Sequence, residues 1–265
     1  MVVLPVKRLA QGKSRLRATL PPAADALPLA LAADTATAAL ACAPVLVVTS
    51  DEMVAAALRR LGATIAAEPD TLAGLNAAIA FGGEVAASQG YRPVAITADL
   101  PAMRPADLGA VLARLDRRAA FVPDRRGDGT TLLAAAQGAA LRPRFGPNSA
   151  MAHRRDGASR LSAPPRLRHD VDTEADLVAA IDLGVGRHTA AVLASVTVVP
   201  MQATVARYDM ASRSGTVLLD DGGELSFDAA AFARSGLRLL RLGQRVRLDR
   251  DATGTVIGLS IPTMS

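Results

Sequence analysis

One aspartate in the middle of the chain combines a reactive side chain with a position where ligands bind. Val94–Ile96 form a short apolar run typical of a buried parallel strand, and Asp99 follows before Pro101 rules out further ladder hydrogen bonds. Open α/β sheets bind ligands at the carboxyl ends of their strands, where a carboxylate suits a hard cation such as Mg²⁺. As an N-cap for the helix expected from Pro105, Asp99 lies too far upstream. We therefore predict that Asp99 is a catalytic residue and a metal ligand.

A second acidic group occurs late in the chain, where one residue separates Asp170 from Asp172. We expect this pair at the end of a strand, and its period-two spacing would then point both side chains to the same face. Thr173 and Asp176 complete the Thr-x-x-Asp pattern of a capping box for the following helix. Two carboxylates that face one way repel each other unless a cation lies between them. A carboxylate of this pair facing Asp99 would complete an acidic metal site.

The first loop holds the cationic side chains that a polyphosphate would need. Only two of the thirty lysine and arginine residues are lysines, and these, Lys7 and Lys13, lie six positions apart after the apolar run at residues 2–6. Together with Arg8 and Arg15 they place four cations at a strand's carboxyl end, where ammonium groups act as point charges for phosphates. The spacing fits neither a P-loop nor a GxGxxG loop, so a solvated basic turn is the alternative.

Two further segments offer neutral donors. Asn76 lies near the start of a helix expected over residues 74–88, where exposed amides and an Asn side chain can pair with a base edge or a phosphate. Simple capping by a polar residue is the alternative. Farther along the chain, a glycine turn leads into a strand that begins with the adjacent hydroxyls of Thr130 and Thr131.

The segment 143–155 has the composition of an anion site. Gly146 and Ser149 precede a helical stretch, and Arg144 and Arg154 lie nearby in the sequence. Free amides, a hydroxyl and positive charge together would bind a phosphate or a carboxylate. The alternative is that Ser149 is an ordinary N-cap.

These candidates must be positioned by a regular α/β domain. Six or seven apolar runs alternating with helical patterns favour a doubly wound, mostly parallel, Rossmann-like α/β sheet with right-handed crossovers. The strands are expected at residues 2–6, 45–49, 64–67, 94–96, 120–123 and within 125–136, and the helices at 25–42, 51–61, 74–88 and 105–115, with further helices after Ser149 and Thr173.

The pattern changes near residue 200. We predict a first domain over residues 1–193, a linker at 194–200, and a second domain over 201–265 whose five short strands indicate a small all-β barrel of the OB or cold-shock type. Eight arginines nearly balance seven acidic residues from 201 onward, and the segment SRSGTVLLDD lacks the aromatic side chains that stack on single strands. We expect a structural or oligomerisation role, with RNA binding as the alternative.

Composition restricts the classes of protein that remain. Half of the 265 residues are hydrophobic, so the chain can bury a full core. No apolar run reaches the roughly 18–20 residues of a membrane span, and no secretory leader is expected. Cys42 is the only cysteine, which excludes disulfides within the chain and cysteine-based zinc clusters. The three histidines share no ligand spacing and are expected to be structural or surface residues. We expect a cytoplasmic protein without a membrane partner.

Taken together, these segments resemble one family. The matching blocks are LPVKRLAQGKSRL, VVTSD, GLNAAI, TADLPAMRPADL, GDGTTLL, RFGPNSAMAHR and RHDVDTEADL, ending in LGVG. These blocks follow one another in the same order as in the family. No single block identifies the family, but the whole set does. Residues 1 to about 193 thus resemble the 2-phospho-L-lactate/phosphoenolpyruvate guanylyltransferases of coenzyme F-420 biosynthesis, relatives of the molybdenum-cofactor guanylyltransferase.

The resemblance implies transfer of GMP from GTP, with Mg²⁺, to the phosphate of a small phosphorylated acid, with release of pyrophosphate. The acceptor is phosphoenolpyruvate in actinobacterial members and 2-phospho-L-lactate in archaeal ones. The arginine-rich, lysine-poor composition is typical of a GC-rich genome and favours phosphoenolpyruvate.

The resemblance also implies roles for individual residues. The family holds its acceptor through a threonine backbone, a glycine and a serine, which correspond here to Thr131, Gly146 and Ser149. Its metal ligands correspond to Asp99 and to one of Asp170 and Asp172, and the alignment leaves that pair open.

The remaining assignments concern the nucleotide. Lys7, Lys13 and Arg15 would hold the triphosphate and stabilise the leaving pyrophosphate, and Asn76 would contact the base or the ribose. Two other functions remain as alternatives. Guanylyl or cytidylyl transfer to a pterin cofactor usually accompanies a glycine-rich LAGGxSxRM loop, which residues 4–16 lack. A nucleic-acid-binding regulator that uses the C-terminal barrel would show salt-dependent binding.

Overall fold

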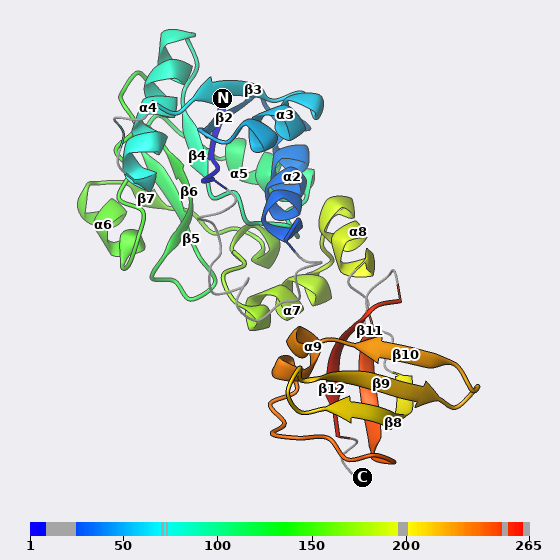
Figure 1. Ribbon diagram of the computed structural model, residues 1–265. Helices are drawn as coiled ribbons and strands as arrows, with labels where there is room; N and C mark the ends of the chain where they lie inside the picture. Colours follow the sequence, from blue (N-terminus) through cyan, green and yellow to red (C-terminus); the bar gives the residue numbers. More distant parts are fainter. Residues whose placement is uncertain (9–24, 70–71, 73, 196–200, 251–253, 262–265) are drawn as a thin grey trace. The chain divides into compact units, whose positions relative to one another are not determined.

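The computed structural model describes residues 1–8, 25–69, 72, 74–195, 201–250 and 254–261 (Figure 1). The chain forms two compact units: the first holds the N-terminal strand and the residues up to Ala190, and the second holds Ala191 onward. Residues 196–200 lie outside the described residues, so the linker at 194–200 and the domain limits at 193 and 201 remain predictions.

A seven-stranded sheet forms the centre of the first unit, in the order β3-β2-β1-β4-β6-β5-β7. Only β6 runs antiparallel to its neighbours β4 and β5, and the other neighbouring pairs are parallel. The strands are β1 (Val2–Pro5), β2 (Val45–Thr49), β3 (Thr64–Ala67), β4 (Val94–Ile96), β5 (Ala120–Pro123), β6 (Thr130–Ala134) and β7 (Ser159–Arg160). This confirms the predicted doubly wound, mostly parallel α/β class.

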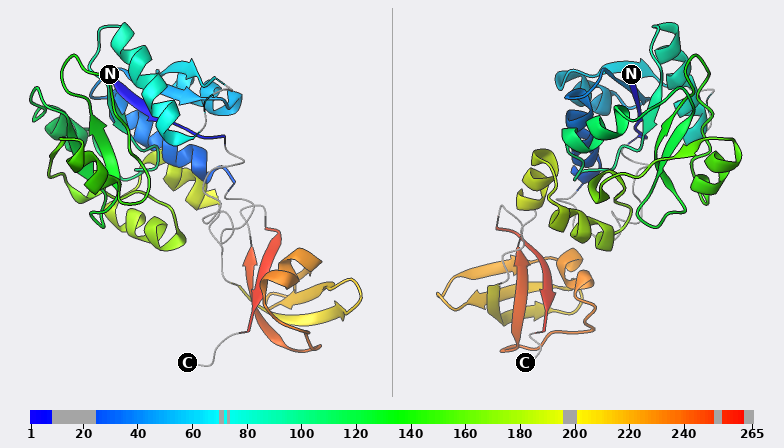
Figure 2. Two further views of the ribbon diagram at one scale, coloured as in Figure 1. Left: turned by 90° about the vertical axis from the view of Figure 1, so that its left-hand side faces the viewer. Right: turned by 180° about the vertical axis from the view of Figure 1, so that it is seen from behind.

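Helices cover both faces of this sheet, because successive residues of a strand point to opposite sides. In β1, Val2 and Leu4 belong to a core with α2, α3 and α5, whereas Val3 packs with Ala78 and Ala86 of α4. The helices are α2 (Leu27–Leu40), α3 (Glu52–Arg60), α4 (Leu75–Ser88), α5 (Pro105–Leu112) and α6 (Ser149–Arg155). Figure 2 shows α2 (blue) and α4 (cyan) on opposite sides of β1.

The helix starts follow the capping signals of the sequence. Asp51 caps α3 and accepts hydrogen bonds from the backbone N–H groups of its first turn. Thr173 caps α7 (Glu174–Leu183) in a capping box with Asp176, as predicted. The N-cap of α5 is Arg104, so Asp99 does not cap that helix.

The strand expected before Asp170 is absent from the described chain, so that prediction was wrong. A 3₁₀ helix, η3 (Pro165–Leu167), precedes the acidic pair instead. Pro164 and Pro165 lack the backbone N–H that a ladder requires, which explains why no strand forms. A backbone hydrogen bond of 3.1 Å, which the N–H of Val171 donates to the carbonyl of Asp99, joins the acidic segment to the loop after β4.

Helix α8 (Arg187–Ser195), which begins in the first unit and continues past its last residue, Ala190, is capped by a residue far away in the sequence. The carboxylate of Asp34 in α2 is 5% exposed and accepts hydrogen bonds from the backbone N–H groups of His188 (2.9 Å) and Thr189 (2.8 Å). Gly186 leaves room for this contact, since a Cβ there would collide with the Asp34 carboxyl group. Asp34 therefore fixes where α8 begins.

Replacing Asp34 by Ala is expected to lower the free energy of unfolding by about 2 kcal/mol. The change removes an N-cap and leaves two N–H groups without their acceptor. Urea unfolding of the full chain, followed by circular dichroism, measures the loss. Asp182→Ala in α7 removes an exposed carboxylate and serves as the control, with an expected change below about 0.5 kcal/mol. Equal stability of the two variants would contradict the capping role.

The second unit contains a five-stranded antiparallel sheet in the order β10-β9-β8-β11-β12. Its elements are β8 (Met201–Asp209), β9 (Ser214–Leu219), β10 (Glu224–Phe227), α9 (Ala229–Arg234), β11 (Arg245–Arg250) and β12 (Val256–Ser260). One core joins the sheet to α9, with Val205, Val217, Phe227, Phe232 and Val246 among its buried residues. Five short strands around one core fit the predicted OB-like unit, and its structural or oligomerisation role remains a prediction.

The helices were also compared with the requirements of a membrane span. In the described part of the chain, no single helix is long and apolar enough to cross a bilayer, while the bent pair of α7 and α8 meets the length and composition criteria only when its two helices are combined.

Candidate active site

A cavity of about 740 Å³ lies at the carboxyl ends of β1 and β4. Its lining comes from seven separate stretches of the first unit: the end of β1, the first half of α2, the start of α4, the loop after β4, the turn that leads into β6, the segment from the loop before α6 to the first residue of that helix, and the segment that contains Asp170 and Asp172. Asp99, Asp170 and Asp172 line this cavity, and so do Lys7, Gly146 and Ser149. The structure therefore brings six of the predicted site residues to one cavity, at the carboxyl edge of the sheet, where open parallel α/β sheets bind ligands.

Asp99 and the late acidic pair are neighbours in space. The Val171–Asp99 backbone hydrogen bond holds the segment 170–172 against the loop after β4. Val171 is fully buried between the two aspartates, whereas Asp170 is half-buried and Asp172 is exposed. The pair thus faces the cavity with Asp99, as the sequence predicted, although a loop and not a strand presents it.

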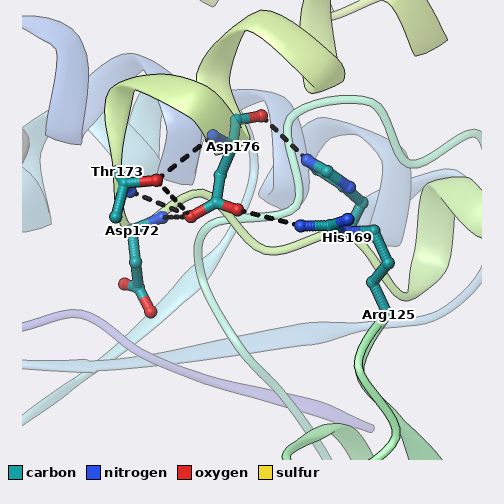
Figure 3. Close-up of polar contacts among 5 residues, drawn as sticks. All are labelled: Arg125, His169, Asp172, Thr173 and Asp176. Atoms are coloured by element: carbon teal, nitrogen blue, oxygen red, sulfur yellow. Dashed lines mark hydrogen bonds and ion pairs between the residues drawn. The ribbon is translucent and has the colours of Figure 1, made fainter.

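Asp176 stabilises the segment that carries the acidic pair. Its carboxylate accepts hydrogen bonds from the backbone and hydroxyl of Thr173 and forms a 3.3 Å ion pair with Arg125, while its carbonyl contacts His169 (Figure 3). Burial opposes the ionisation of Asp176, but the hydrogen bonds from Thr173 and Asp172 and the charge of Arg126 together lower its pKa. Asp176 is structural, because its carboxylate is engaged with Thr173 and Arg125, whereas the Asp172 carboxylate points away from this network (Figure 3).

Lys7 lies between two cavities. It lines the large one and also a second of about 320 Å³, whose walls include Ser50 after β2, Glu68 after β3, and Gly74 before α4. Lys7 is exposed, which leaves its ammonium group accessible to a ligand. Lys13 and Arg15, predicted beside it, lie outside the described residues.

Asn76 has a different position from the one expected for a nucleotide contact. It is absent from the lining of both cavities, and its side-chain amide pairs with the backbone of Phe145, donating to the carbonyl (2.9 Å) and accepting from the N–H (2.7 Å). A side-chain amide can donate to the C=O and accept from the N–H of one residue at the same time, so Asn76 holds the loop before α6 in place. We therefore withdraw its assignment to the base or the ribose.

The loop before α6 ends in a strained turn. Gly146 has φ of 132° and Asn148 has φ of 58°, a left-handed conformation that few non-glycine residues adopt. Asn148 is the N-cap of α6, so the alternative that Ser149 caps this helix was wrong. Ser149 is the first residue of α6 and is 1% exposed, and it lines the cavity together with Gly146.

Of the two adjacent threonines of β6, Thr131 is buried in the core and Thr130 lines the cavity. Thr131 is fully buried and absent from the cavity lining; its hydroxyl donates to the carbonyl of Leu167 (2.8 Å), and its own carbonyl accepts from the N–H of Thr97 (3.0 Å), so its assignment to the acceptor stays a prediction. Thr130 lines the cavity and contacts the imidazole of His153, with 3.0 Å between Thr130 Oγ1 and His153 Nδ1. The family resemblance assigned the acceptor to the backbone of Thr131, and the sequence alone does not reveal that the neighbouring Thr130 lines the cavity.

His153 was expected to be structural or at the surface, and it is 1% exposed in α6. It packs against the rings of Phe121 and Phe145, and its Nε2 accepts a hydrogen bond of 2.9 Å from the backbone N–H of Arg144. Burial lowers the pKa of His153 to about 4, with the charge of Arg144 acting in the same direction and Asp156 opposing it. Its imidazole is therefore neutral at neutral pH. No spacing pattern in the sequence marks this contact with Thr130.

The donor set suits a hard cation held partly by substrate. The acidic groups of the cavity offer carboxylate oxygens, which Mg²⁺ prefers. Among the described residues, no group of three or more His, Cys, Asp or Glu side chains forms a complete metal cage. Mg²⁺ is commonly bound through one or two carboxylates and completes its shell with phosphate oxygens and water, so the carboxylates that line this cavity are suitable donors for it.

Comparison with known proteins gives a consistent assignment. The model of the family described as "Guanylyl transferase CofC like" matches residues 1–212. A phosphoenolpyruvate guanylyltransferase of Salinispora arenicola is 50% identical over 201 residues, which cover 71% of this chain and 91% of that protein. Enzymes of the same name from Thermomonospora curvata and Streptomyces coelicolor are 47% and 48% identical over 202 residues, covering 73% of this chain and 88% and 95% of theirs. The chain belongs to the CofC-like guanylyl transferase family.

Proposed function

We propose that the protein transfers GMP from GTP to phosphoenolpyruvate and releases pyrophosphate, in coenzyme F-420 biosynthesis. The observation that carries this proposal is the 740 Å³ cavity, which combines Asp99 and the acidic pair with Gly146 in the loop before α6 and Ser149 at the start of that helix. The names of the relatives support the choice of guanylyl group and acceptor. We also propose the cytoplasm as its location, where GTP and phosphorylated acids are formed.

The two cavities suit the two parts of a nucleotide. The smaller one, walled by the ends of β1, β2 and β3, would take the nucleoside, and the larger one would take the phosphates and the acceptor. Lys7 belongs to both linings and would lie beside the triphosphate where the nucleotide passes between them. Lys13 and Arg15 are proposed as further triphosphate ligands.

Asp99, with Asp170 or Asp172, would hold Mg²⁺. Such an ion neutralises phosphate charge and orients the two reacting groups. Asp99 lies directly after a buried strand and the pair is fixed to it through Val171, so the ligands are positioned before substrate binds. This rigidity reduces the reorganisation that the reaction requires.

The reaction needs no covalent enzyme intermediate. A phosphate oxygen of the acceptor already carries a negative charge and can form a bond to the α-phosphorus of GTP, while the bond from that phosphorus to the bridging oxygen breaks and pyrophosphate leaves. The work of the protein is alignment and charge neutralisation. Ser149, Gly146 and the Thr131 backbone would orient the acceptor, and Lys7, Lys13 and Arg15 would stabilise the leaving pyrophosphate.

The test is pyrophosphate release from GTP and Mg²⁺ with phosphoenolpyruvate, 2-phospho-L-lactate and 3-phosphoglycerate as separate acceptors. We expect turnover with phosphoenolpyruvate and at least tenfold lower kcat/KM with the other two, because 2-phospho-L-lactate is tetrahedral where phosphoenolpyruvate is planar, and 3-phosphoglycerate carries its phosphate one carbon farther from the carboxylate, so neither aligns the attacking oxygen equally well. Reactions without acceptor and with EDTA are the controls. A folded protein that binds GTP but is inactive with all three acceptors would refute the proposal.

A further inference from the structure

Two hydrogen bonds determine where the proton of His153 lies. A backbone N–H can only donate, so the contact from Arg144 requires a lone pair on Nε2. A neutral imidazole with an unprotonated Nε2 carries its proton on Nδ1. The depressed pKa described above agrees with a neutral ring. His153 therefore donates from Nδ1 to Thr130 Oγ1.

This donation determines the direction in which the Thr130 hydroxyl can act. A threonine hydroxyl has one hydrogen to donate and lone pairs that accept. The imidazole occupies the accepting side, so the hydroxyl hydrogen is directed away from His153. Thr130 is 6% exposed and lines the cavity, and within the described chain His153 is the one hydrogen-bond partner recorded for its hydroxyl.

We propose that Thr130 contacts the acceptor substrate, donating its hydroxyl proton to an anionic oxygen, and that His153 is the positioning residue that makes this hydroxyl a donor. The inference rests on the proposed function for the identity of the acceptor. The ligand atom is an oxygen of a phosphate or of a carboxylate, since both accept charge-assisted hydrogen bonds.

The surroundings of His153 support this role. The ring is held by Phe121 and Phe145 and by the Arg144 N–H, so it cannot turn without breaking packing and a hydrogen bond. Its Arg144 contact also belongs to the loop that carries Gly146 and Ser149, which line the cavity beside Thr130. One imidazole thus links the direction of the Thr130 hydroxyl to the position of the proposed acceptor loop.

The first experiment compares Thr130→Val with Thr130→Ser in the full chain with GTP and Mg²⁺. Valine keeps the shape and removes the hydroxyl, so the KM for phosphoenolpyruvate should rise about tenfold or more, while the KM for GTP changes less than twofold. Serine should restore the acceptor KM to within about threefold of the original protein. An unchanged acceptor KM in the valine variant, with the original protein active, would overturn the inference and leave the proposed function intact.

Competitive inhibitors identify the oxygen. If Thr130 contacts the phosphate, Thr130→Val should weaken inhibition by inorganic phosphate and leave inhibition by pyruvate unchanged. If it contacts the carboxylate, the opposite result is expected. Inhibition constants that are unchanged for both compounds would contradict a contact with the acceptor.

His153 is tested by a spectrum and by a double-mutant cycle. The ¹⁵N chemical shifts of the imidazole should show the Nδ1-protonated neutral tautomer at pH 7, and only three histidines have to be assigned. The Nε2-protonated form would refute the mechanism even if every variant at this site failed to fold. His153→Phe should raise the acceptor KM in the original protein and have a smaller effect in Thr130→Val, because no hydroxyl remains to be oriented. Equal effects in the two backgrounds would show a purely structural role.

Discussion

Replacing Asp99 by Asn is expected to lower kcat for GMP transfer by about 10³-fold, with a smaller change in the KM for GTP. The substitution keeps the size of the side chain and removes the charge that would hold Mg²⁺ at the reacting phosphates. A loss of this order corresponds to about 4 kcal/mol, as is typical when a preorganised charged group is removed from a site that stabilises a developing charge. Pyrophosphate release at saturating GTP and phosphoenolpyruvate measures it.

The matched control is Asp128→Asn. Asp128 lines the same cavity, and it is exposed on the turn before β6, outside the proposed metal ligands. Its replacement removes an equal charge and should change kcat less than threefold. The same comparison made with Asp170→Asn and Asp172→Asn would show which member of the pair acts with Asp99. Full activity of Asp99→Asn, or equal losses for Asp99 and Asp128, would refute the proposed metal site.

Replacing Lys7 by Met is expected to lower kcat/KM for GTP about 100-fold. The change keeps a long unbranched side chain and removes the one charge that belongs to both cavity linings among the described residues. A charge-assisted contact to phosphate is roughly twice as strong as a neutral one, and its effect increases as the leaving pyrophosphate gains charge. Initial rates over a range of GTP concentrations give the value.

Two variants make the Lys7 result specific. Lys7→Arg keeps the charge but replaces a point charge by a planar fork, so it should recover activity only in part. Arg60→Met removes an exposed cation at the end of α3, away from both cavity linings, and should leave kcat/KM within twofold. A Lys7→Met enzyme with the same kcat/KM as Arg60→Met would exclude a role for Lys7 in nucleotide binding.

The sequence determined the local architecture of the first unit, because that architecture depends on short-range patterns. Apolar runs predicted β1, β2 and β4, and the residues Asp51 and Thr173 marked the starts of α3 and α7 through capping chemistry. The alternation of these elements was sufficient to predict the α/β class. Because open α/β sheets bind ligands at the carboxyl ends of their strands, the position of Asp99 after β4 was sufficient to predict that it lies at the cavity.

The tertiary structure decided which side chains meet, because those contacts join residues that no sequence period relates. Asn76 and Phe145 are 69 positions apart, and their pairing gives Asn76 a structural role that its position at a helix start concealed. Asp34 and Thr189 are 155 positions apart, so no capping pattern in the sequence could show that α2 caps α8.

The same reason applies to the site itself. The acidic pair lies beside Asp99 through the N–H of Val171 and not through a strand, since prolines 164 and 165 prevent a ladder there. Whether Thr130 or Thr131 faces the cavity depends on how β6 is placed in the sheet, and the proton on His153 depends on a backbone N–H nine residues away. Residue types therefore indicated the chemistry, whereas long-range packing determined which atoms are directed at the ligand.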